Sequence, residues 1–153
     1  MPPSWHIRSF RELTLEDLYD LIRLRVDIFV VEQACPYHEL DGKDCHEKTR
    51  HVWARSGDGR MAACARVLAP GVSFSGASIG RVAVHPEFRG QGLARALLLQ
   101  CLETVAAAWP GIPVCIGAQT YLESFYRSFG FVRCSETYLE DGILHVDMVL
   151  NRS

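Results

Sequence analysis

The chain has 153 residues, of which 48% are hydrophobic and 22% charged, and its formal net charge is −2. This balance is typical of a globular protein with one hydrophobic core, and we expect residues 1–153 to form a single domain. The mild acidity and the lack of a basic stripe argue against nucleic acid as a partner. No apolar run approaches the roughly 20 residues that span a bilayer, and the N-terminal segment lacks a secretory signal. The sequence therefore predicts a cytoplasmic protein that associates with neither nucleic acid nor membrane.

The first half of the chain predicts a strand, a helix and a pair of strands. Thr14 and Asp17 form a capping signal at the start of the helix, and apolar residues then recur at helical spacing. The expected elements are a strand at 5–10, a helix from 14 to 33, a polar connection at 34–50, and strands at 51–56 and 60–69. A Gly-Asp-Gly turn at 57–59 joins the last two strands as a hairpin.

The second half alternates strands and helices. Its expected elements are a strand at 78–86, a helix at 93–108, a strand at 112–118, a short helix at 122–130, and strands at 132–140 and 143–150. The resulting order, β-α-β-β-β-α-β-α-β-β, predicts an α/β domain with a mixed sheet. Cys64, Cys101 and Cys115 lie within apolar segments, so we expect free thiols, which suit a reducing compartment.

The segment V-A-V-H-P-E-F-R-G-Q-G-L-A, residues 82–94, is the most informative part of the chain. A buried strand ends here, and Arg89, Gly90, Gln91 and Gly92 lead into the long helix without a good capping side chain. The backbone N–H groups of the first helical turn are then free for an anion, which glycines allow to approach closely. Arg89 adds a cation that suits phosphate oxygens. The pattern predicts a pyrophosphate site.

The same segment has features of other phosphate-binding motifs. A Walker A motif is excluded because no G-K-[ST] follows the glycines. The dinucleotide fingerprint is matched only at Gly90 and Gly92, since Arg95 takes the place of its third glycine. A glycine-rich entry to a helix with no ligand is the remaining alternative.

R-G-Q-G-L-A fits the pattern R-x-x-G-x-A and follows V-A-V-H-P, and together they resemble the acetyl-CoA signature of the GNAT superfamily of N-acetyltransferases. Gln119, Leu122 and Tyr126 stand where that superfamily often has N-x-x-A-x-x-x-Y, and F-G-F at 129–131 matches its Y-x-x-x-G-F ending. The segments L-R-V-D-I-F-V-V-E-Q-A-C-P-Y, D-G-K-D, G-A-Q-T-Y-L-E-S-F-Y-R-S-F-G-F and Y-L-E-D-G-I-L-H-V resemble the ElaA-like subgroup. The likeness covers nearly the whole chain.

The resemblance implies the GNAT acyl-CoA N-acyltransferase fold and transfer of an acetyl group from acetyl-CoA to an amine on a small molecule or peptide. It implies that the backbone of Val82, Ala83 and Val84 pairs with the pantetheine arm. It also implies that the amides of Arg89, Gly90, Gln91, Gly92, Leu93 and Ala94 hold the pyrophosphate, and that Gln119, in place of the usual Asn, touches the pantetheine or its sulfur end.

Attack of an amine on a thioester needs a neutral amine, a stabilised oxyanion and a proton for the leaving thiolate. A backbone N–H of Val82 or Val84 suits the oxyanion. Tyr126, at the superfamily's tyrosine position, is the predicted general acid; the alternative is that it merely packs beside Phe125. Glu32 is a candidate base if an apolar wall raises its pKa, and otherwise an ordinary solvated carboxylate.

Other candidate bases are His51, His85 and His145, or a chain of waters. His85 precedes a proline and is better explained as a turn residue, whereas His145 is either a core histidine or a residue of the acceptor pocket.

The segment 32–47 is acidic and could attract a cationic amine, with Asp41 and Asp44 as candidate substrate contacts; the alternative is a solvated loop. The cysteines and histidines of the same segment match no zinc pattern, so we predict no metal site.

Two other functions are compatible with the sequence. Arg25, Phe29, the Asp41–Asp44 pair and Arg66 faintly resemble acyl-homoserine-lactone synthases, which share the acyltransferase fold. The second rival is a sensor module that binds acetyl-CoA without catalysis. Unpaired strand edges also leave a homodimer open.

Overall fold

A computed structural model describes residues 2–152. One mixed sheet runs through it in the order β1-β2-β3-β4-β5-β8-β6, and β7 pairs with β8 beside this path. The strands are β1 (Ser4–Arg8), β2 (Arg50–Arg55), β3 (Met61–Leu68), β4 (Ala77–Val84), β5 (Val114–Gln119), β6 (Val132–Arg133), β7 (Tyr138–Glu140) and β8 (Ile143–Leu150). All neighbours are antiparallel except β4 and β5, which are parallel.

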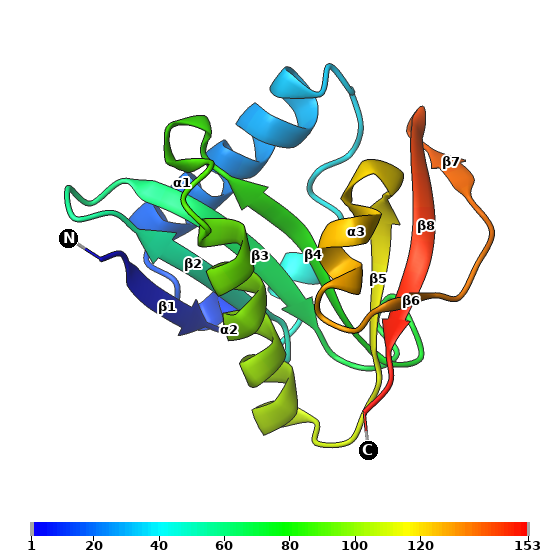
Figure 1. The fold of residues 1–153 in the computed structure, drawn as a ribbon. Coiled ribbons are helices and arrows are strands. Elements are labelled where there is room, and N and C mark those ends of the chain that lie inside the picture. Colours follow the sequence, from blue (N-terminus) through cyan, green and yellow to red (C-terminus); the bar gives the residue numbers. More distant parts are fainter. Residues whose placement is uncertain (1, 153) are drawn as a thin grey trace.

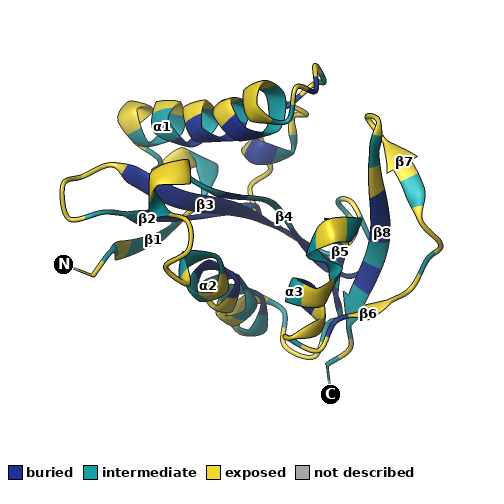
Figure 2. Ribbon diagram, turned by 45° about the horizontal axis from the view of Figure 1, so that its top comes forward, coloured by how far each residue is buried: buried dark blue, intermediate teal, exposed yellow. Residues whose placement is uncertain are grey.

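Helices cover both faces of this sheet, as Figures 1 and 2 show. On one face lies α1 (Leu15–Arg25), which continues as a π-helical segment, η2 (Val26–Glu32). On the other face lie α2 (Leu93–Ala108) and α3 (Glu123–Arg127). Short 3-10 turns occur at η1 (Phe10–Glu12), η3 (Lys43–Cys45), η4 (Pro86–Phe88) and η5 (Thr120–Leu122). The predicted mixed α/β architecture is confirmed.

Two apolar layers hold the helices to the sheet. Leu97, Leu98 and Val105 of α2 pack on one face, and Leu21 and Leu24 of α1 pack on the other. β3 lies between both layers and is buried at every position, which explains its unbroken small and apolar sequence. None of the helices within residues 2–152 has the length and apolar character needed to cross a bilayer.

Several predicted boundaries need correction. The Thr14 side chain accepts a hydrogen bond from Asp17 N at 3.0 Å, which confirms the predicted cap. The regular α-helix ends at Arg25, however, and the remainder of the predicted helix is π-helical. The predicted strand 132–140 is split into β6 and β7. At the break the side-chain hydroxyl of Ser135, rather than a backbone carbonyl, accepts the hydrogen bond from Asp147 N at 2.9 Å.

Candidate functional site

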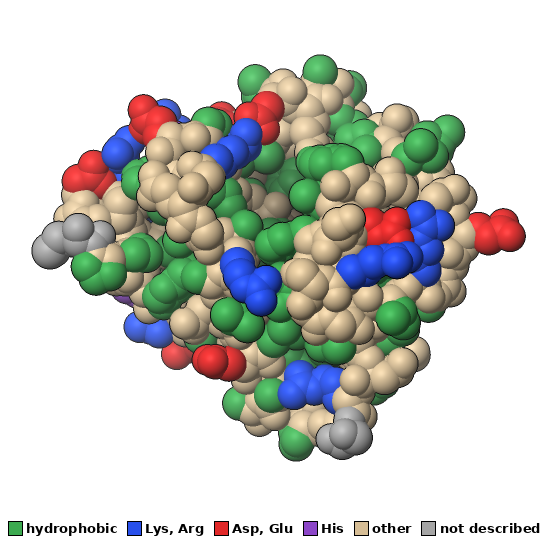
Figure 3. All heavy atoms as spheres, viewed as in Figure 1, with side chains coloured by type: hydrophobic (Ala, Val, Ile, Leu, Met, Phe, Trp, Pro, Cys, Tyr) green, Lys and Arg blue, Asp and Glu red, His purple; other side chains and the backbone are tan. Residues whose placement is uncertain are grey.

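A cleft opens where β4 and β5 separate. The two strands are paired only at Ala77–Val114 and Ser78–Cys115, and beyond these positions no pairing joins them in the described part of the chain. The cleft has a volume of about 960 Å³ and reaches from the start of α2 to the β7–β8 hairpin. Figure 3 shows the surface hollowed there, with hydrophobic side chains on its floor. A groove open along a strand edge suits an extended ligand that pairs with the backbone.

A β-bulge shapes the β4 side of this cleft. Cys64 of β3 pairs with Ala83, but Arg66 pairs with Gly80, so Arg81 and Val82 together face one residue of β3. Arg81 has a φ of +52°, a conformation that L-residues adopt only under constraint. A bulge takes a residue out of the hydrogen-bonding ladder and bends the strand. The backbone at Val82, Ala83 and Val84, predicted to meet pantetheine, therefore borders the cleft.

The predicted phosphate-binding turn lies at the mouth of the cleft. Gly90 and Gly92 both adopt left-handed conformations, with φ of +77° and +75°. Gly92 is the N-cap of α2, and no side chain caps the first turn, as predicted. Arg89, Gly90, Gly92, Leu93 and Ala94 line the cleft. The uncapped amides of a 16-residue helix thus border the groove, and such amides together with the helix dipole favour an anion.

The Arg89 side chain is fixed by two partners. It donates from Nε to the carbonyl oxygen of Val84 at 3.0 Å, and its Nη atoms donate to both carboxylate oxygens of Glu32 at 3.0 and 2.8 Å. The hydrogen bonds from Arg89 lower the pKa of Glu32. Of the two interpretations of Glu32, the one that requires a raised pKa is therefore wrong, because Glu32 faces a guanidinium group rather than an apolar wall.

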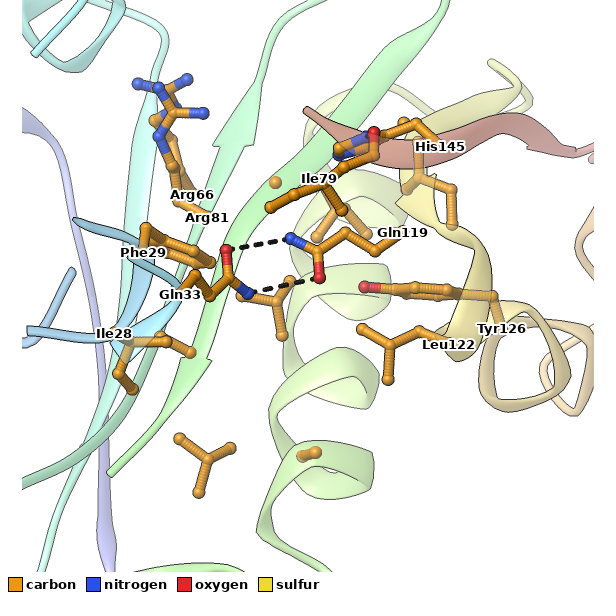
Figure 4. A pocket seen from close by; sticks show the side chains of 18 of the residues that line it. Ile28, Phe29, Gln33, Arg66, Ile79, Arg81, Gln119, Leu122, Tyr126 and His145 are labelled. Atoms are coloured by element: carbon orange, nitrogen blue, oxygen red, sulfur yellow. Dashed lines mark hydrogen bonds between the residues drawn. The ribbon is translucent and has the colours of Figure 1, made fainter. Parts of the chain in front are cut away.

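Gln119 and Tyr126 both line the cleft, and their side chains lie near each other (Figure 4). Gln119 ends β5, and its amide pairs with the amide of Gln33 across the cleft. Tyr126 lies on α3 with only 6% of its surface exposed, and its hydroxyl points toward Gln119. Burial raises the pKa of the Tyr126 phenol to about 12. Sequence reasoning missed Gln33, because a polar residue at the end of an amphipathic helix gives no signal of its own.

His145 lines the cleft from β8, and it is paired with Gln119 in the β5–β8 register. It is 8% exposed and stacks on Tyr138. The other histidines named as candidate bases have structural partners. His51 is buried, its Nε2 bonds to the carbonyl oxygen of Asp44, and burial lowers its pKa. His85 accepts a hydrogen bond from Glu87 N, which confirms its interpretation as a turn residue.

The acidic segment is held in a network of ion pairs. Asp44 is buried and contacts Arg25 at 2.8 Å and Arg66 at 3.1 Å. Asp41 contacts Arg66 at 2.9 Å and Arg81 at 3.4 Å. Asp41 lines the cleft, whereas Asp44 lies outside its lining. The carboxylate charges predicted to attract an amine are thus compensated by arginines. Within residues 2–152 no group of His, Cys, Asp and Glu is arranged to hold a metal ion.

A mixed sheet whose strands β4 and β5 separate, followed by an uncapped, glycine-led helix, has the architecture of the acyltransferase class. The model of the acetyltransferase (GNAT) domain matches residues 25–152, and the chain belongs to this family, in its ElaA-like subgroup. The chain is 41% identical to Protein ElaA of Escherichia coli K12 over 145 residues, which cover 95% of this chain and 94% of that protein.

Solved structures of acyltransferases share the fold of this chain. An acyl-CoA N-acyltransferase from Pseudomonas aeruginosa superimposes with a TM-score of 0.93 at 39% identity, covering 99% of this chain and all of that one. Escherichia coli ElaA gives a TM-score of 0.91 at 39% identity, with the same coverage. The acyl-homoserine lactone synthase BjaI gives 0.79 at 20% identity, covering 99% of this chain and 84% of that one, which shows a shared fold.

Proposed function

We propose that this acyltransferase is an N-acetyltransferase that moves an acetyl group from acetyl-CoA to a primary amine by direct attack on the thioester. The observation that carries the proposal is the uncapped start of α2 at Gly90 and Gly92, set at the mouth of a groove bordered by β4. A pyrophosphate on these amides lets the pantetheine arm lie along β4, with its sulfur end near Gln119 and Tyr126.

The side chains around that sulfur end support the chemistry. Tyr126 is protonated at neutral pH, since the ordinary pKa of a phenol, 10.0, already lies well above 7 and burial raises it further, so it has a proton to donate to the leaving thiolate. A backbone N–H of Val82 or Val84 is the proposed oxyanion donor. His145 pairs with Gln119 and alternates with Val146, which packs in the α2-side core, so His145 lies on the α1 side of the sheet. His145 and Asp41 both line the cleft and are the proposed contacts of the amine. The six free cysteines support the proposed cytoplasmic location.

Calorimetry with acetyl-CoA, followed by thiol release with a panel of amines, tests the proposal. Suitable probes are a polyamine, a lysine-containing peptide and a peptide with a free N-terminus, each product being identified by mass spectrometry. We expect acetyl-CoA to bind and thiol release to depend on an amine. Binding without release for any amine would favour a sensor module instead. Release only with S-adenosylmethionine and a longer acyl-CoA would favour the acyl-homoserine-lactone reaction.

A further inference from the structure

Two consecutive residues at the end of η2 reach across the cleft. The Glu32 carboxylate accepts two hydrogen bonds from Arg89. Gln33 forms two reciprocal hydrogen bonds with Gln119 (Figure 4). The Gln33 Nε2–Gln119 Oε1 distance is 3.3 Å, and the Gln119 Nε2–Gln33 Oε1 distance is 3.2 Å. Arg89 follows β4 and Gln119 ends β5, so the end of η2 is tied to both sides of the groove.

Hydrogen bonds of the π-helical type hold the backbone at the end of η2 in place. Gln33 N donates to the carbonyl oxygen of Ile28 at 3.1 Å, and Cys35 N donates to that of Val30 at 3.0 Å, both five residues back. These bonds fix the backbone that carries Gln33. Single π-helical turns within helices are frequent at functional sites, because the wider turn redirects side chains.

The amide pair fixes how Gln119 presents itself to a ligand. A primary amide has two N–H donors and two lone pairs on its oxygen. Reciprocal pairing with Gln33 uses one N–H donor and one oxygen lone pair of Gln119. The second N–H donor and the second lone pair of Gln119 stay available to a ligand, and the pairing fixes their directions. A free glutamine side chain samples many rotamers, and ordering them on binding costs affinity. Gln33 removes that cost before a ligand arrives.

We propose that Gln33 is a positioning residue for acyl-CoA binding, which acts by holding the amide of Gln119 toward the pantetheine arm. This inference rests on the proposed function, because it takes Gln119 as a coenzyme contact. The Glu32–Arg89 pair supports it by anchoring the neighbouring residue of the same turn. Gln33 itself needs no contact with the coenzyme for this role.

A double-mutant cycle on acetyl-CoA affinity, measured by calorimetry on the full chain, tests the proposal. We expect Gln33→Ala to weaken binding about fivefold, the cost of ordering one rotamer-rich side chain on binding. Gln119→Ala should weaken it at least as much, and the double variant should lose no more than Gln119→Ala alone. Val31→Ala is the matched control, because Val31 lies in the same turn and is 66% exposed. Its affinity should stay that of the unaltered chain.

Independent, additive losses from the two glutamine substitutions would overturn the positioning role, and so would full affinity in Gln33→Ala. Gln33→Met, which keeps the length of the side chain and removes its amide, gives the same test if the alanine variant folds poorly. Failure of the unaltered chain to bind acetyl-CoA would overturn the proposed function as well. Intact binding with an additive cycle would overturn this inference alone.

Discussion

His145 donates a hydrogen bond from Nδ1 to the backbone carbonyl oxygen of Ile143 across 2.7 Å. A carbonyl oxygen can only accept, so in the neutral imidazole the proton lies on Nδ1 and Nε2 keeps a free lone pair. Nε2 lies 3.7 Å from a carboxylate oxygen of Glu140, and the ring stacks on Tyr138 with centroids 5.8 Å apart. The ring is thus held in the tautomer whose Nε2 can accept a proton.

Replacing His145 tests whether it deprotonates the acceptor. We expect His145→Gln to lower kcat/KM for the amine about a hundredfold, because general base catalysis contributes on that order. Thiol release at saturating acetyl-CoA and increasing amine concentration is the measurement. His46→Gln, at an exposed histidine outside the cleft, is the control. An unchanged kcat/KM in His145→Gln would assign the base to another group or to water.

Gly92 offers a matched test of the phosphate corner against Gly59. Both have φ near +80°, and an added Cβ would meet nothing within 4 Å at either position. Alanine at either should therefore destabilise the fold by about 1 kcal/mol through backbone strain alone. Only Gly92→Ala should also weaken acetyl-CoA binding, by about tenfold, because its Cβ stands where a phosphate approaches the helix amides. Equal acetyl-CoA affinity in the two variants, measured by calorimetry, would place the pyrophosphate elsewhere.

Features set by nearby residues were predictable from the sequence. The capping signal at Thr14 and the uncapped glycine entry to α2 both depend on residues within one turn, and both appear as predicted. The order of strands and helices followed from periodicity and turn residues for the same reason. The spacing of Arg89, Gly90 and Gly92 also predicted a pyrophosphate site at a turn that lines the cleft in the structure.

Features that depend on distant partners were not predictable. The ion pair that lowers the pKa of Glu32 joins residues 57 positions apart, and the Gln33–Gln119 pair joins residues 86 apart. The acidic look of segment 32–47 was misleading for the same reason, since the arginines that compensate Asp44 come from α1 and β3. Charge counted along a segment omits the partners that folding brings to it.

The ion pairs of Asp41 predict a loss of stability in acid. Burial alone would raise the pKa of Asp41, but hydrogen bonds and charge from Arg66 outweigh it and lower the pKa to about 2. A carboxyl whose folded pKa lies below its ordinary 3.8 contributes stability that is complete above about pH 5 and is lost as the pH falls toward 2. Urea unfolding should therefore show a smaller drop in stability over this range for Asp41→Asn than for the unaltered chain. Asp27→Asn, at an exposed i,i+4 pair, should leave the drop unchanged.

Tyr126→Phe separates catalysis from packing. Phenylalanine preserves the ring contacts with Phe125 and Phe131, whose centroids lie 5.2 and 6.0 Å away, and removes only the hydroxyl. We expect kcat to fall about a hundredfold while the affinity for acetyl-CoA and the urea midpoint stay close to those of the unaltered chain, because the proton for the thiolate is needed only as the thioester bond breaks. Tyr19→Phe, at a 70% exposed tyrosine on α1, should change none of these quantities. Single-turnover measurements of thiol release isolate the chemical step, and an unaltered rate in Tyr126→Phe would mean that the thiolate leaves without help from this phenol.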